Sequence, residues 1–74
     1  MVKLRILSGR EVCRILTQHG YEEIRQRGSH IIMQKKTEDS TITVPVPSHK
    51  ALRIGTLMSI IRQSRLDRTI FETD

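Results

Sequence analysis

The chain is poor in cysteine, in aromatic residues and in long apolar runs. It has 74 residues, of which one is cysteine, none is tryptophan and two are aromatic, Tyr21 and Phe71. A single cysteine, Cys13, excludes an intrachain disulfide and fits a reducing compartment. No run of about 18 apolar residues is present to span a membrane, and the first residues lack the apolar core of a signal peptide. We therefore expect a cytoplasmic protein with one domain over residues 1–74.

Several motifs of enzymes and metal proteins are missing as well. The cysteine and the three histidines have none of the short spacings that zinc sites use. The four glycines form no phosphate-binding or dinucleotide-binding pattern, and no nucleophile elbow is present. Glu22 and Glu23 are adjacent, so on a strand they would point to opposite faces. We expect no metal and no cofactor.

Positive charge is concentrated in the first half of the chain. Residues 1–36 hold eight Lys or Arg and three acids, whereas residues 37–74 hold five of each. A one-sided positive field attracts anionic partners, and nucleic acid is the obvious one. Charge alone also fits a soluble domain that is merely basic. Two aromatic residues are too few to favour recognition of single-stranded bases by stacking.

The pattern of residues predicts a helix at about residues 9–19. Ser8 and Glu11 have the spacing of a capping box, with Leu7 and Val12 at the positions of a hydrophobic staple. Gly20 then ends the helix, because glycine tolerates the left-handed conformation.

Three strands are expected next, at residues 21–26, 29–36 and 41–46, with turns at 27–28 and 37–40. Pro45 cannot donate to a strand ladder, so the third strand should lie at a sheet edge or leave the sheet there.

After a loop, a second helix is expected from Gly55 and Thr56, followed by a short helical turn after Asp67. The order is helix, three strands, helix. This pattern predicts an α+β fold in which two helices cover one face of a three-stranded antiparallel sheet and leave the other face open.

The three histidines differ in their expected roles. His19 stands at the end of the first helix, where it can bond the last carbonyl groups, and His49 lies in a loop. Strand alternation places His30 on the open face, whereas Ile31 and Met33 point to the core. Each could be a structural or solvated histidine, and His49 beside Lys50 could also bind phosphate or transfer a proton.

His30 lies within "RQRGSHIIMQKK", residues 25–36, a stretch with four cations and no acid. An imidazole can remove a proton from a ribose 2′-hydroxyl or protonate a leaving oxygen, and cations can stabilise charge on the phosphate. RNA carries its own nucleophile, so such a site would need no metal.

The motifs "RQRGSHIIM", "TVPV" and "ALRIGTLMSIIRQS", in this order and spacing, resemble the HicA family of bacterial toxins. The resemblance covers about residues 8–71. It implies a fold like that of a double-stranded-RNA-binding domain, an endoribonuclease activity on mRNA, His30 as the catalytic residue, and a HicB-type antitoxin as partner. Family members often carry a histidine shortly after the Val-Pro pair, but Pro47 stands in the commonest place here and His49 comes two residues later.

Our main hypothesis is a metal-independent endoribonuclease that cleaves mRNA, with His30 as general acid or base. Gly28 would form the turn that presents His30, and Ser29 would orient the site. The expected phosphate-binding residues are the four cations of the stretch, Arg25, Arg27, Lys35 and Lys36. Two alternatives remain open with the same fold: a non-catalytic module that binds structured RNA, and a protein-interaction domain whose open face meets a partner.

Overall fold

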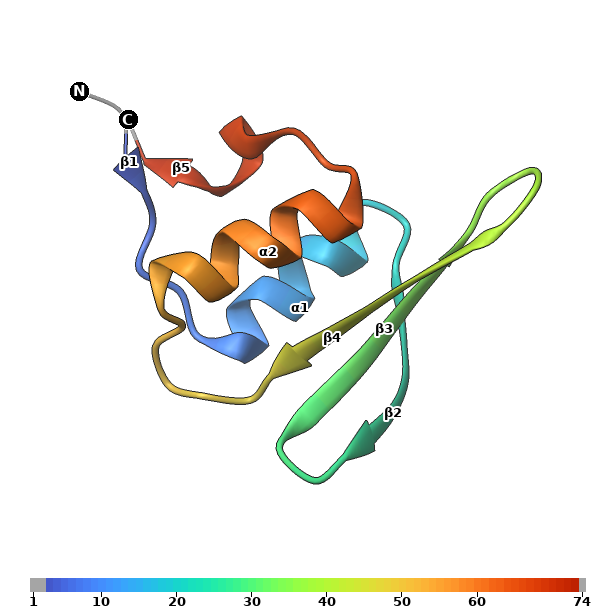
Figure 1. The fold of residues 1–74 in the computed structure, drawn as a ribbon, viewed down its shortest axis with the longest axis horizontal. Coiled ribbons are helices and arrows are strands. Elements are labelled where there is room, and N and C mark those ends of the chain that lie inside the picture. Colours follow the sequence, from blue (N-terminus) through green and yellow to red (C-terminus); the bar gives the residue numbers. More distant parts are fainter. Residues whose placement is uncertain (1–2, 74) are drawn as a thin grey trace.

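A three-stranded antiparallel sheet forms one layer of the computed structural model, which describes residues 3–73. Its strands are β2 (Glu22–Arg27), β3 (His30–Lys36) and β4 (Thr41–Pro47), with β3 in the centre. Each lies within one residue of its predicted bounds. The helices α1 (Gly9–Gln18) and α2 (Ile54–Ser64) lie together against one face of this sheet (Figure 1). The predicted α+β fold and its helix–strand–strand–strand–helix order are confirmed.

The start and the end of α1 follow from the residues that flank it. The Ser8 hydroxyl accepts from the backbone N–H of Glu11 at 3.0 Å, and the Glu11 carboxylate accepts from the backbone N–H of Ser8 at 2.8 Å. Leu7 and Val12 are both buried beside this capping box. Gly20 adopts a φ of +95°, a conformation that residues with a side chain rarely adopt, so the helix ends there.

The core lies between the helices and the covered face of the sheet. Ile31 and Met33 of β3 are completely buried, whereas His30 is exposed and Ile32 is half-buried. This alternation confirms the two faces predicted for β3. Further fully buried side chains come from both helices, from β4, from the C-terminal segment and from the segments on either side of α1; among them are Leu16, Val44, Leu57, Phe71 and Tyr21.

Strand β4 is an edge of the sheet, as Pro45 predicted. Pro45 pairs with Ile32, and Pro47 pairs with His30. Proline has no backbone N–H to donate. An edge strand tolerates it, because one side of that strand has no neighbouring strand that needs a donor. Two prolines also discourage the pairing of this edge with another chain.

A second, very small sheet forms where β1 (Lys3–Leu4) pairs with β5 (Glu72–Thr73). It lies on the side of the molecule opposite the outer end of the β3–β4 hairpin (Figure 1). Strands of two residues carry no periodicity, and the sequence did not predict them. Between α2 and β5, a 3-10 helix at Arg68–Phe71 confirms the helical turn expected after Asp67. Within residues 3–73, no helix has the length and apolar character needed to cross a membrane.

Candidate functional site

His30 is held at the start of β3 by a tight turn. Arg27 pairs with His30, so the two residues of the turn are Gly28 and Ser29. The turn therefore lies one residue later than the predicted turn at residues 27–28. Gly28 has a φ of +57°, and a two-residue hairpin needs such a positive φ at its first central residue. The Ser29 carbonyl accepts from the backbone N–H of Ser48 at 2.7 Å, which ties the turn to the loop after β4.

Two arginines share the open face of the sheet with His30. Arg27 stands directly opposite His30 on β2, and Arg25 stands opposite Ile32, the next outward residue of β3. Opposite residues in an antiparallel pair have Cβ atoms about 4.5–5.5 Å apart, and diagonal neighbours are about 7–8 Å apart. Both guanidinium groups can therefore reach a phosphate placed beside the His30 imidazole.

A β-bulge between Glu23 and Arg25 shifts the register of β2 against β3, and it decides which of the two adjacent glutamates shares the face of the arginines. Glu23 lies on the helix side, where it accepts from Arg10 of α1 at 3.0 Å. Glu22 pairs with Gln34 on the open face, beyond Arg25. The glutamates thus point to opposite faces, as predicted, and the positive strip of Arg27 and Arg25 ends at Glu22.

The side chains of Arg25 and Arg27 are exposed and make no hydrogen bond or ion pair within residues 3–73. Arg10 and Arg68, by contrast, are each paired with a glutamate. His30 is also exposed and has no side-chain partner in the described chain. The three groups are therefore available to an external ligand.

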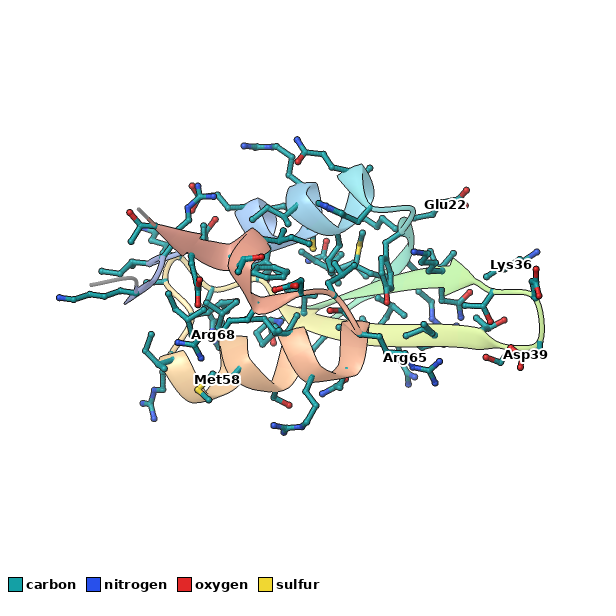
Figure 2. All side chains as sticks on the ribbon, turned by 90° about the horizontal axis from the view of Figure 1, so that it is seen from above. Glu22, Lys36, Asp39, Met58, Arg65 and Arg68 are labelled. Carbon is teal, nitrogen blue, oxygen red and sulfur yellow. The ribbon has the colours of Figure 1, made fainter. Side chains whose placement is uncertain are left out.

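The two lysines of the basic stretch lie elsewhere. Lys35 pairs with the buried Ile42 and so points to the helix side, where its ammonium nitrogen lies 5.9 Å from the centre of the Tyr21 ring. Lys36 shares the face of His30, but it is six residues further along the strand, about 20 Å away. In Figure 2, both Lys36 and Asp39 lie at the outer end of the β3–β4 hairpin. The structure thus brings together Arg25, Arg27 and His30, and neither lysine.

A cleft of about 320 Å³ opens beside His30, between β4 and α2. We call it the α2 cleft. Its lining residues are His30, Pro45 and Pro47 on the strands, and Gly55, Thr56, Ser59, Ile60 and Gln63 on α2. His30 is the one lining residue whose side chain is an acid or a base. The sequence analysis did not assign the residues of α2 to the site. Gly55 was a possible signal, because a glycine within a helix lowers its stability and often has a packing or functional role.

The other two histidines and the cysteine lie outside this cleft. His19 caps the end of α1, where its Nδ1 lies 2.9 Å from the carbonyl oxygen of Ile15, as predicted for a structural histidine. His49 has an exposed side chain, and its backbone carbonyl accepts from Gly9 at 2.9 Å. Cys13 is buried, and burial raises the pKa of its thiol to about 11.

Comparison with protein families matches most of the chain to a known family. The family model described as the HicA toxin of bacterial toxin–antitoxin systems matches residues 9–66, from the start of α1 to just beyond α2. No curated protein and no solved structure shows significant similarity to the chain. The matched segment contains β2, β3 and β4, with His30 and the α2 cleft. The chain belongs to the HicA family, the toxins of bacterial toxin–antitoxin systems, and this membership implies a cognate antitoxin as its partner.

Proposed function

We propose that this toxin is a metal-independent endoribonuclease that cleaves mRNA with His30 as general acid or base. The observation that carries the proposal is the position of His30, which is exposed, has no partner in residues 3–73, lies opposite Arg27 and lines the α2 cleft. Family membership supports the toxin role, and the site geometry supports the chemistry.

The chemistry needs two proton transfers. The 2′-hydroxyl loses a proton as its oxygen attacks the adjacent phosphorus, and the departing 5′-oxygen gains a proton as its bond to phosphorus breaks. The His30 imidazole can perform one of these transfers. No other lining residue of the α2 cleft has an acidic or basic side chain, so the second transfer falls to water or to a group outside the cleft.

Arg25 and Arg27 would bind the phosphate and offset the charge that builds on its non-bridging oxygens. Lys36 would steer more distant RNA, because it shares this face at the outer end of the hairpin. Gly28 and Ser29 would hold His30 in place through the turn. We assign Lys35 no direct contact with the scissile phosphate, because it points to the helix side of the sheet.

Induced expression in a bacterial host tests the proposal. We expect the wild type to arrest growth and degrade transcripts, and His30→Ala to do neither while remaining folded by circular dichroism. His19→Asn is the matched control, because His19 lies at the end of α1 and Asn is tolerated at helix ends. Transcript degradation that persists in His30→Ala would overturn the role of His30.

Two other outcomes would favour the alternative functions. RNA binding without any cleavage product, unaffected by His30→Ala, would favour a non-catalytic RNA-binding module. Growth arrest with intact transcripts would favour a protein-interaction domain. In a cell-free assay, cleavage that stops on addition of EDTA would contradict the metal-independent mechanism.

A further inference from the structure

The α2 cleft differs in chemistry from the positive strip on the other side of His30. Arg27 and Arg25 lie on the β2 side, whereas Pro47 and the cleft lie on the β4 side. No lining residue of the cleft is Lys, Arg, Asp or Glu. The positive strip attracts the phosphate groups of RNA. The cleft, which has no charged lining residue, is suited instead to an uncharged part of the same RNA chain.

The lining of the cleft combines apolar surface with uncharged polar groups. Pro45, Pro47 and Ile60 contribute the apolar surface, and Thr56, Ser59 and Gln63 contribute hydroxyl and amide groups. Gln63 donates from its amide nitrogen to the Ser59 hydroxyl at 3.0 Å, which leaves its carbonyl oxygen and one N–H available. A nucleobase has the matching form, two apolar faces and an edge of donors and acceptors.

Aromatic stacking is not available to such a base. Tyr21 and Phe71 are the two aromatic residues of the chain, and both are buried in the core. The proline rings are the apolar surface that lies next to His30. The cleft volume of about 320 Å³ is at the lower end of the range for small-molecule sites, about 300–1,000 Å³.

We propose that the α2 cleft binds the nucleobase next to the scissile phosphate, and that Ser59 and Gln63 determine which base is preferred there. This inference rests on the proposed ribonuclease function. RNA whose phosphate lies on Arg25 and Arg27 and whose scissile bond lies at His30 places its next nucleotide at the cleft. The amide of Gln63 is the group best suited to recognise the base edge.

Gly55 offers a way to close the cleft without disturbing the fold. Its φ is not positive, and an added Cβ would have no neighbour within 4 Å. Glutamine is also a better helix former than glycine. Gly55→Gln should therefore fold at least as well as the wild type while its side chain occupies the cleft. Met58→Gln is the matched control, because Met58 is exposed on the same helix, outside the cleft (Figure 2).

The experiment maps cleavage positions on a pool of short RNAs with randomised sequence, using purified wild type, Gly55→Gln, Gln63→Ala, Met58→Gln and His30→Ala. We expect a base preference next to the cut in the wild type. Gln63→Ala should reduce that preference by about tenfold, and Gly55→Gln should reduce kcat/KM by about tenfold, both without a lower Tm. Met58→Gln should behave as the wild type.

Three outcomes separate this inference from the function on which it rests. Cleavage that depends on His30 but shows no base preference would overturn the inference and leave the ribonuclease intact. Cleavage patterns and rates that are unchanged by both Gly55→Gln and Gln63→Ala would also overturn the inference without affecting the ribonuclease. That result would favour a protein partner as the occupant of the cleft. No cleavage by the wild type, or cleavage unaffected by His30→Ala, would overturn the proposed ribonuclease itself.

Discussion

Cations that are close in sequence should differ in their effect on RNA binding, because they lie on different faces of the sheet. Arg25→Gln, Arg27→Gln and Lys35→Gln each remove one positive charge, so each takes the formal net charge from +5 to 5 − 1 = +4. Arg25 and Arg27 share the face of His30, whereas Lys35 lies on the other side over the Tyr21 ring. The first two substitutions should weaken RNA binding, and the third should have little effect.

The size of the effect follows from counterion release. Each phosphate contact with single-stranded nucleic acid contributes about 0.7 to the slope of log affinity against log salt. Each arginine substitution should therefore lower the slope by about 0.7, and the double variant by about 1.4. When salt rises from about 50 to about 200 mM, the affinity of the parent chain for RNA falls by some factor. For the double variant that factor should be about seven times smaller, because its slope is lower by about 1.4.

Fluorescence anisotropy with a short labelled RNA can measure these slopes, with His30→Ala as the parent chain so that the RNA stays intact. The Lys35→Gln variant is the internal control, because it changes the net charge by the same amount. A slope lowered as much by Lys35→Gln as by Arg27→Gln would refute the assignment of faces. A slope unchanged in the double arginine variant would refute the phosphate contacts.

Further predictions concern the stability and reactivity of the fold. Tyr21→Phe should lower the free energy of unfolding in urea by about 1–3 kcal/mol, because the buried Tyr21 hydroxyl donates to the Ser64 carbonyl at 2.8 Å; a loss near zero would contradict this. The pKa of Glu11 is lowered from 4.5, first by its hydrogen bond from the Ser8 backbone, so its charge stabilises the fold above about pH 4.5 and less as the pH falls below that. The Tm difference between the wild type and Glu11→Gln should therefore shrink from pH 7 to pH 3, and a constant difference would count against the linkage. The raised pKa of the buried Cys13, about 11, predicts that iodoacetamide at pH 8 alkylates the unfolded chain but not the native one, as mass spectrometry can show.

Local patterns predicted the helices and strands well, because their causes are local. The Ser8–Glu11 capping box and Gly20 set the two ends of α1, and both signals lie within the helix ends themselves. The alternation of His30, Ile31 and Met33 fixed the faces of β3. The same alternation already separates Lys35 from Lys36, so the sequence contained the signal that distinguishes these two lysines.

The features that the sequence did not predict depend on distant contacts. The bulge before Arg25 sets which glutamate faces the arginines, and it follows from the pairing of β2 with β3. The α2 cleft brings Pro47 together with Gly55 and Gln63, which meet because α2 packs beside the edge strand β4. Periodicity within one element carries no information on such packing between elements.

Single-turnover cleavage of a defined RNA by the purified chain, in buffer with EDTA, tests the central claim most directly. Loss of a proton-transfer group typically lowers a rate by about 10²–10⁴-fold. The wild type should therefore cleave without added metal, and His30→Ala should cleave about 10²–10⁴-fold more slowly, with the same Tm. Equal rates for the wild type and His30→Ala would contradict the assignment of His30 as the general acid or base.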